Sequence, residues 1–378
     1  MERRTRTMEN LGLKMAFKDI FKGKTVLVTG HAGFKGSWLS LWLESLGAKV
    51  CGYSLLPDTE FTAYSVLGIK ELLAAEKIAD IRDSETLEKF FAQTRPEIVF
   101  HLAAQPLVRL SYDEPKLTYE TNVMGTLNVL EAARKCGAVK AFVNVTTDKC
   151  YENPDNGIPR KEDDPMGGYD MYSSSKGCSE ILTASYRRSF LEGGKPFALA
   201  SARAGNVIGG GDWAKDRLVP DCVRALSKGM PAPVRNPASV RPWQHVLEPL
   251  AGYMRLAQKL LEEPEKFSDG FNFGPDSSAV LSVGDIVDIL VGVWGGSSSS
   301  IKADSAGPHE AKLLSLDVSK ADKLLGVRPV LDAAKAVAMT AEWYKLFYAK
   351  HPQMRAFSIK QIENFCSAAR DKQIEWSF

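Results

Sequence analysis

The sequence has little of what marks several large classes of protein. Its six cysteines are scattered without a CxxC pair, which argues against a disulfide scaffold and suits reduced thiols in a cytoplasm. A formal net charge of +2 gives no electrostatic reason to expect nucleic acid or a membrane surface as a partner. No apolar run reaches the roughly 18 residues that a spanning helix needs. The five histidines are dispersed, so we expect no metal site.

What is present is the composition of a soluble globular protein, with 44% apolar and 25% charged residues. Residues 1–20 are Arg-rich at the front but lack a secretory apolar core. We therefore expect a flexible extension there, with Met8 and Met15 as alternative starts. Glycine and proline become frequent after residue 205. We expect a dinucleotide-binding domain over 21–205 and, over 206–378, mainly a substrate-binding lobe with some strands returning to the first sheet.

A glycine-rich turn near the start predicts a dinucleotide site. The β-branched run 24–29 reads as a buried strand, and Gly30, Gly33 and Gly36 follow it. A periodic helical segment then runs to Gly47, and 49–54 reads as a second strand. In such a βαβ unit a pyrophosphate approaches backbone N–H groups at the helix N-terminus. The spacing is G-x-x-G-x-x-G rather than the commoner G-x-G-x-x-G, and a P-loop motif is absent.

The choice between NAD and NADP stays open at this point. The second strand lacks the acidic residue that usually meets the ribose hydroxyl, and Ser54 stands in its place. Lys35 or His31 could meet a 2′-phosphate instead. Further along, Asp80 could accept from the adenine amino group, and the apolar strand expected over 98–104 ends in small residues that would let a cofactor lie close. The complete predicted cofactor set is Gly30, Gly33, Phe34, Lys35, Gly36, Ser54, Asp80, Ile81, Leu102, Ala103, Ala104, Thr121, Tyr172 and Lys176.

Two short motifs predict the chemistry. Tyr172 and Lys176 are four residues apart, so on a helix they share one face. A nearby ammonium and a cationic nicotinamide favour the phenolate, which makes a tyrosine usable as a base near neutrality. Thr147, Asp148 and Lys149 directly follow the strand predicted over 141–146. Because ligands bind at the carboxyl ends of strands in a doubly wound sheet, we expect all five residues in one catalytic site.

These motifs resemble the extended short-chain dehydrogenase/reductase family over about residues 20–350. The supporting strings are TGHAGFKGSWLSLWL, HLAAQPLVRLSYDEP, TNVMGTLNVLEA, TTDKCYEN, GGYDMYSSSKGCSE, RAGNVIGGGDWAKDRLVPD and RPWQHVLEPL. TGHAGFKGSWL and TTDKCYEN are similar to the subgroup of nucleotide-sugar 4,6-dehydratases that acts on CDP-glucose. The resemblance implies an α/β fold, with a Rossmann doubly wound parallel sheet and a smaller mixed α/β C-terminal lobe.

The resemblance also implies a reaction. NAD takes a hydride from sugar C4 while Tyr172 takes the O4 proton, helped by Thr147. Loss of the C5 proton and of the C6 hydroxyl, with Asp148 as acid, eliminates water, and the hydride then returns to C6. Lys149 stands where relatives acting on dTDP-glucose carry a glutamate. It takes the C5 proton if its pKa is lowered, or it stays charged and stabilises the enolate.

Residues expected to meet the substrate follow from the same resemblance. Asn122 matches an asparagine that shapes the active-site backbone, and His245 could touch the substrate or serve a structural purpose. Arginines bind a diphosphate bidentately. The expected substrate set is Arg109, Asn122, Asn206, Asp212, Trp213, Arg217, Leu218, Arg235, Arg241 and His245. The resemblance further implies a cytoplasmic homodimer or homotetramer, paired through long helices.

Two other functions remain open from the sequence. A nucleotide-sugar 4-epimerase or decarboxylase on the same scaffold would keep Tyr172 and Lys176 but would not need Asp148 and Lys149. A non-catalytic, cofactor-bound regulatory protein could keep the glycine turn and lose the tyrosine. Base selectivity rests on the resemblance alone.

Overall fold

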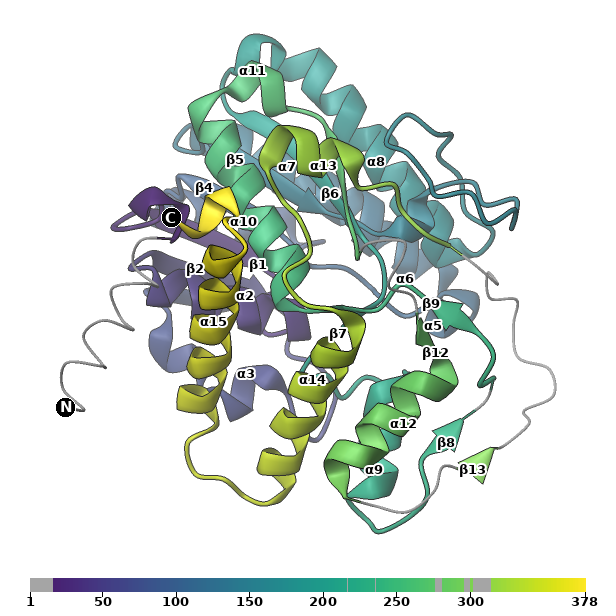
Figure 1. Ribbon diagram of the computed structural model, residues 1–378. Coiled ribbons are helices and arrows are strands. Elements are labelled where there is room, and N and C mark those ends of the chain that lie inside the picture. The colour runs from purple at the N-terminus through teal and green to yellow at the C-terminus, as the bar shows by residue number, and fades with distance from the viewer. Residues whose placement is uncertain (1–15, 216, 235, 276–280, 296–299, 302–313) are drawn as a thin grey trace.

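A seven-stranded parallel sheet forms the centre of the computed structural model (Figure 1). The structure describes residues 16–215, 217–234, 236–275, 281–295, 300–301 and 314–378. The strands lie in the order β11-β6-β5-β4-β1-β2-β3. Their bounds are β1 (Thr25–Thr29), β2 (Lys49–Ser54), β3 (Ala75–Ile78), β4 (Ile98–His101), β5 (Ala141–Val145), β6 (Ala198–Ala204) and β11 (Gly270–Phe273).

The strand order reverses between β1 and β4. β1 pairs with β2 on one side and with β4 on the other, and all three run parallel. The chain therefore leaves β1 and β4 toward opposite sides, and a crevice for ligands is expected outside their carboxyl ends. This arrangement confirms the predicted Rossmann doubly wound sheet.

Helices cover both faces of the sheet, and each face has its own apolar core. One core contains residues of α2 (Phe34–Ser45), α10 (Leu247–Glu262), α14 (Ala333–Tyr348) and α15 (Met354–Asp371). The other contains residues of α4 (Ser84–Thr94), α7 (Thr126–Cys136) and α8 (Met171–Phe190). Three shorter helices lie in the connections between strands: α3 (Ala63–Val66) follows β2, and α5 (Val108–Asp113) and α6 (Pro115–Tyr119) follow β4.

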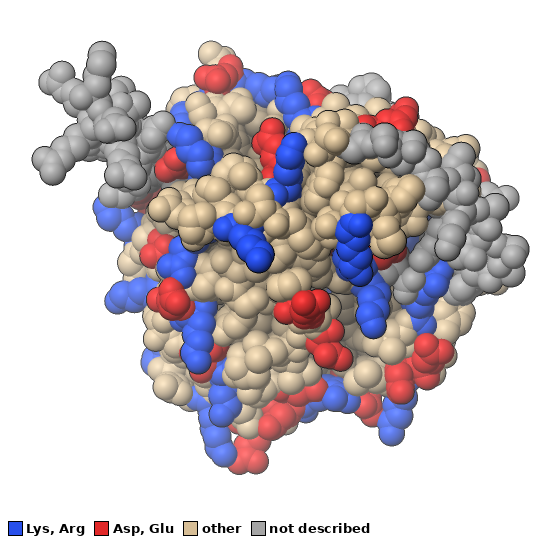
Figure 2. All heavy atoms as spheres, turned by 90° about the horizontal axis from the view of Figure 1, so that it is seen from below, with Lys and Arg blue, Asp and Glu red and all other residues tan. Residues whose placement is uncertain are grey.

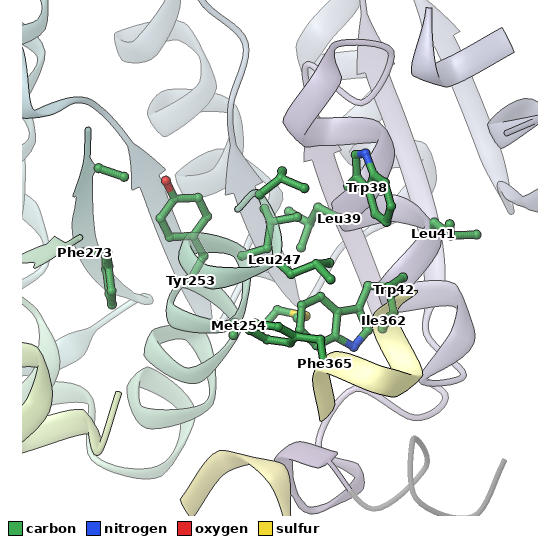
Figure 3. Packing of buried hydrophobic residues seen from close by; sticks show 14 of the residues in the cluster. Trp38, Leu39, Leu41, Trp42, Leu247, Tyr253, Met254, Phe273, Ile362 and Phe365 are labelled. Carbon is green, nitrogen blue, oxygen red and sulfur yellow. The ribbon is translucent and has the colours of Figure 1, made fainter. Parts of the chain in front are cut away.

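The first core locks α2 in place beneath the glycine turn. Trp38 and Trp42 are fully buried, and Figure 3 shows Trp42 beside Met254 of α10 and Ile362 and Phe365 of α15, with Trp38 further along α2. The Trp38 indole donates to the carbonyl of Gly210 at 2.8 Å. Phe365 meets Trp42 edge-on at 5.8 Å between ring centres. Large aromatic side chains bury much apolar surface, so this packing fixes the position of the α2 N-terminus.

The polypeptide after β6 builds a smaller lobe of short elements. Three two-stranded pairs occur there: β7 (Val207–Ile208) with β10 (Gln244–His245), β9 (Val240–Arg241) with β12 (Leu281–Ser282), and β8 (Pro233–Val234) with β13 (Ser300–Ile301). Its helices are α9 (Leu218–Leu226) and α12 (Val283–Trp294), which pack against each other. Two further short helices, α11 (Pro264–Phe267) and α13 (Ser319–Leu325), pack on α10 and on strands of the main sheet. β11 leaves this region and pairs with β6 in the main sheet.

The N-terminal prediction needs a correction. Residues 1–20 were expected to form a flexible extension, but Ala16–Asp19 form a 3₁₀ turn and Phe17 is fully buried. Its ring stacks on Trp376 at 5.1 Å between centres, and the Lys18 amide donates to the carbonyl of Phe378 at 3.2 Å. The apolar ring finds a partner near the far end of the chain, which local composition does not reveal.

Most predicted elements of the first domain form at nearly the predicted places. Residues 120–136 are helical: a π-helical turn, Glu120–Gly125, leads into α7. β3 was not predicted because Ala75–Ile78 carries two charges and no alternating apolar pattern.

Charged side chains of both signs are interspersed on the face in Figure 2. No helix in the described part of the chain combines the length and the apolarity required to span a bilayer.

Candidate active site

The glycine turn after β1 is shaped to receive an extended polar group. Gly30 has φ +75°, and a Cβ there would lie 2.7 Å from the backbone nitrogen of Ala103. A Cβ on Gly36 would overlap the carbonyl oxygen of Gly30, and a Cβ on Gly33 would lie 3.3 Å from the same oxygen, a tight contact. Gly33 also caps α2 without a side-chain hydrogen bond. The free N–H groups of this helix end therefore suit an anionic group such as a pyrophosphate.

The residues after β5 form the second wall of the site. A 3₁₀ turn (Asp148–Cys150) follows Thr147, whose side chain accepts from the Lys149 amide at 3.4 Å. The Thr147 hydroxyl donates to Oδ1 of Asp148 at 2.9 Å. Asp148 is only 6% exposed. Burial raises its pKa above the usual range, and the Lys149 and Lys35 ammoniums and the Thr147 hydrogen bond only partly oppose this.

Tyr172 and Lys176 reach the same place from α8. Asp170 caps the helix by accepting from the Ser173 amide at 2.8 Å, so Tyr172 and Lys176 lie one turn apart and both are buried. Burial raises the Tyr172 pKa to about 12, while its hydrogen bond with the Thr147 side chain lowers it. Burial lowers the pKa of Lys176 to about 8, and its Nζ lies 3.5 Å from the carbonyl oxygen of Val145.

A hydrogen-bonded network behind the catalytic turn holds it in place. Glu180 of α8 pairs with Arg203 at 2.8 Å and accepts from Ser201 at 2.6 Å. It also accepts from Thr146, the residue before the catalytic turn. Arg203 in turn donates to the Tyr151 hydroxyl at 2.5 Å. The turn is therefore tied on both sides to buried, hydrogen-bonded groups, which favours a single conformation.

The π-helical turn before α7 orders a neighbouring loop. The Asn122 side-chain oxygen accepts from the Gln105 amide at 2.8 Å. Its amide group donates to the Gln105 carbonyl at 3.1 Å and to Ser175 on α8 at 2.9 Å. Asn122 is fully engaged in these bonds and is 1% exposed. It joins the loop after β4 to the tyrosine helix, and π turns of this kind are frequent at functional sites.

Similarity to known proteins identifies the family of this chain. Residues 27–340 match the family model described as GDP-mannose 4,6 dehydratase. The chain belongs to this dehydratase family. It is 47% identical over 358 residues to a CDP-glucose 4,6-dehydratase of Salmonella typhimurium, covering 94% of this chain and 99% of that protein. A dTDP-glucose 4,6-dehydratase of Streptomyces antibioticus is 29% identical, with 85% and 92% covered.

Solved structures show the same fold. A dTDP-glucose 4,6-dehydratase from Streptomyces venezuelae, solved with NAD bound, superposes with a TM-score of 0.75. It is 24% identical, and the match covers 87% of this chain and 99% of that one. This chain therefore has the same fold as that dehydratase. The fold agrees with the family resemblance seen in the sequence.

Two residues predicted to meet the substrate lie in the core instead. The Trp213 ring is 6% exposed and packs between Trp343 and Phe347, with ring centres 5.7 and 4.9 Å away. His245 is fully buried on β10, and burial lowers its pKa to about 3. A histidine that stays neutral in an apolar setting fits the structural alternative.

The two residues considered for a 2′-phosphate also lie elsewhere. His31 is fully buried, and its Nε2 is 2.8 Å from Oε1 of Glu76 on β3. Lys35 turns inward, and its Nζ lies 3.5 Å from the hydroxyl of Tyr253 on α10. The His31 ring is therefore occupied by Glu76, and the Lys35 ammonium by Tyr253. Asp80 is also engaged, since Arg82 binds its carboxylate at 2.8 and 3.0 Å.

The predicted arginines differ in their surroundings. Arg217 pairs with Asp212 at 2.7 Å, and its pKa is raised first by Asp212 and also by Tyr172. This pair therefore belongs to the catalytic cluster. Arg241 lies on β9 and donates to the Val240 carbonyl at 3.3 Å. Leu218 begins α9, Asn206 precedes β7, and Arg109 lies on α5. Arg235 lies outside the described residues.

Tyr253 is the functional candidate that sequence reasoning missed. It is fully buried on α10, yet its hydroxyl meets Lys35 and it interacts with Tyr172 and Asp148. A tyrosine within LEPLAGYMRL looks like one more apolar position on an amphipathic helix. Within the described residues no cluster of potential metal ligands occurs.

Proposed function

We propose that this protein is a CDP-D-glucose 4,6-dehydratase that forms CDP-4-dehydro-6-deoxy-D-glucose and water. The observation that carries the proposal is the buried contact of Tyr172, Thr147 and Asp148. It stands on a chain that is 47% identical over 358 residues to a protein with that activity. A carboxyl group beside the tyrosine is what an elimination requires and an epimerisation does not.

The residues around the glycine turn fit a dinucleotide. The turn leaves no room for side chains at Gly30 and Gly36, and the α2 N-terminus offers N–H groups to a pyrophosphate. We assign NAD as the cofactor, held by this turn and by Ser54, Asp80, Ile81, Leu102–Ala104, Thr121, Tyr172 and Lys176. When bound, NAD supplies the two-electron acceptor for C4 oxidation and the donor for reduction at C6.

The side chains then divide the proton transfers among themselves. Tyr172 takes the O4 proton, and Thr147 hydrogen-bonds that oxygen and the tyrosine. Asp148 gives its proton to the departing C6 hydroxyl, a task that suits a carboxyl whose pKa is raised by burial. Lys149, beside Asp148, acts at C5: it takes the C5 proton, or it stabilises the enolate that forms when that proton leaves.

Substrate binding is assigned to the lobe after β6. Arg217 is held by Asp212 with its charge toward the catalytic cluster. A guanidinium in that position suits the sugar diphosphate, with Arg109, Arg235 and Arg241 as further partners and Asn206 and Leu218 alongside. Asn122 acts indirectly, through the loop and helix that it joins.

A direct assay tests the proposal. Purified protein is incubated separately with CDP-glucose, dTDP-glucose, UDP-glucose and GDP-mannose, and mass spectrometry follows the loss of one water from each. We expect water loss from CDP-glucose alone. An isobaric, epimerised sugar with no water loss would establish an epimerase and refute the dehydratase. Mass spectrometry of the denatured protein identifies the released cofactor in the same samples.

We also propose a homodimer or homotetramer acting in the cytoplasm, in deoxysugar synthesis for bacterial surface polysaccharide. Supporting the assembly, α8 and the neighbouring π turn expose large apolar side chains: Ile181 is 56% exposed, Phe190 53% and Met124 51%. Apolar side chains left exposed on a long helix are available for contact with a second copy of the chain. Sedimentation of the wild type against an Ile181→Glu variant tests the assignment, and a monomeric wild type would refute it.

A further inference from the structure

We propose that Lys35, held by Tyr253, sets the reduction potential of the bound cofactor by placing its positive charge beside the nicotinamide. This inference rests on the cofactor assigned above and not on any particular sugar substrate. It makes Lys35 a residue that favours NADH over NAD⁺, and it leaves the proton transfers with the residues already named.

Lys35 links the two ends of the cofactor site. Its backbone is the second residue of α2, at the helix end assigned to the pyrophosphate. Its ammonium, by contrast, interacts with Asp148 and Lys176 of the catalytic cluster. Lys176 and Tyr172 are the groups assigned to the nicotinamide end of the cofactor. The Lys35 side chain therefore covers the same span that the cofactor covers between its pyrophosphate and its nicotinamide.

Tyr253 fixes the ammonium without cancelling its charge. The Lys35 Nζ lies 3.5 Å from the Tyr253 hydroxyl and 5.9 Å from the centre of that ring. Burial raises the pKa of Tyr253 well above its ordinary value, so the phenol stays neutral. Figure 3 shows the hydroxyl pointing away from Met254 and Phe365, out of the apolar cluster. A neutral partner in that place holds the lysine and leaves its charge in force.

The charged groups around Lys35 leave the cluster positive. Arg217 pairs with Asp212 at 2.7 Å, so these two charges largely cancel. Asp148 attracts the ammonium, but burial raises the pKa of this carboxyl, and its assigned task requires it to be protonated. Among the described groups that act on Lys35, the ammonium of Lys176 is then the one left uncompensated. Two ammoniums therefore lie where the nicotinamide is expected.

A positive charge beside the nicotinamide acts differently on the two forms of the cofactor. The ring of NAD⁺ is a cation, whereas the ring of NADH is neutral. Burial lowers the pKa of Lys35 to about 8, so the side chain is mostly charged at pH 7. Its ammonium disfavours NAD⁺ relative to NADH, strongly so where water is excluded. Lys35 thereby favours hydride removal from C4 and retains the reduced cofactor until the hydride returns to C6.

Binding measurements without sugar test the proposal. Full-length holoprotein is equilibrated with NAD⁺ and NADH mixtures of known composition, and absorbance after rapid filtration gives the ratio in the bound fraction. This ratio reports the two dissociation constants relative to each other. For Lys35→Met we expect the preference for NADH to fall about tenfold or more, which is about 30 mV for a two-electron couple. Lys35→Arg should stay within about threefold of wild type, because a guanidinium keeps the charge.

Lys89→Met is the matched control. It removes one cation from α4, where the Lys89 side chain is 73% exposed and solvent screens its charge, so the wild-type ratio should persist. A wild-type ratio in Lys35→Met would overturn this inference alone. Equal weakening of both forms would also overturn it, since an ammonium at the pyrophosphate acts on NAD⁺ and NADH alike. A wild type that bound neither form would refute the assigned cofactor itself.

The pH dependence and Tyr253→Phe test how the charge is held. The preference for NADH should be full below the Lys35 pKa of about 8 and should decline as pH rises through it, because the ammonium loses its charge. Burial also lowers the pKa of Lys176 to about 8, and Lys35→Arg supplies the pH dependence of that group alone. Tyr253→Phe should move the ratio part of the way toward that of Lys35→Met. An unchanged ratio and pH curve would refute the role of Tyr253. Thermal melting verifies that each variant is folded.

Discussion

Two buried carboxylates differ in their surroundings: Asp148 lies within the catalytic turn, and Glu180 lies on α8 behind it. Burial alone would raise the pKa of Glu180, yet Arg203, Ser201 and Thr146 hold it below the usual range. Asp148 is as deeply buried, but its one side-chain hydrogen bond is to Thr147, and its pKa is raised. A carboxylate with every partner supplied stabilises one structure, whereas one with too few partners is available to bind a proton.

The largest expected effect concerns Asp148. Asp148→Asn should lower product formation by about 10²–10⁴-fold, because the amide cannot protonate the departing hydroxyl. C4 oxidation should persist, so reduced cofactor should accumulate after CDP-glucose is added. The free energy of unfolding should stay the same or rise, since a buried charge is removed. Stopped-flow absorbance and chemical denaturation measure the two quantities. Normal product formation would show that another group is the acid.

Tyr172→Phe should act one step earlier, with an activity loss of similar size. Without the phenolic oxygen, nothing takes the O4 proton, and C4 oxidation should fail. Mixing the variant with CDP-glucose should therefore give no nicotinamide absorbance change. A burst of reduced cofactor would contradict the assignment of Tyr172 as the O4 base.

Arg203→Met tests the other carboxylate. Leaving Glu180 buried without its cation should lower the free energy of unfolding by about 3–5 kcal/mol. Because the folded-state pKa of Glu180 is lowered, its stabilisation is present above its ordinary pKa and is lost as pH falls. The variant's deficit should therefore shrink on acidification. The double variant Glu180→Leu, Arg203→Met should regain part of the lost free energy of unfolding. Equal stability of the wild type and Arg203→Met at pH 7 would show that Glu180 does not depend on its cation.

The smallest expected effect is on stability at Lys35. A lysine whose pKa is lowered from 10.5 to about 8 destabilises the fold while it is charged in both states. Lys35→Met should therefore raise the free energy of unfolding at pH 7 by about 1–3 kcal/mol. The gain should fade as pH rises from about 8 to about 10.5, where the wild-type lysine becomes neutral in both states. Urea titrations across that range measure it, and a pH-independent difference would argue against the charged, buried lysine.

The catalytic motifs could be predicted from the sequence because they are local. Thr147 and Asp148 follow a strand, Tyr172 and Lys176 share a helix face, and a parallel sheet brings such segments to one edge. The inward course of Lys35 could not be predicted, since it depends on Tyr253, which is distant in sequence and placed by the packing of α10. The burial of Trp213 and His245 could not be predicted, because a motif does not show which side of the chain faces the core.

The aromatic contact between Phe17 and Trp376 has a consequence for how the molecule opens. Residues 16–19 and 375–378 share one hydrophobic cluster and one backbone hydrogen bond. Peeling the chain from either side must first break that shared cluster, so local opening at the two sides is one cooperative event. Amide hydrogens of both segments should exchange with the same opening free energy, although more than 350 residues separate them in the 378-residue sequence.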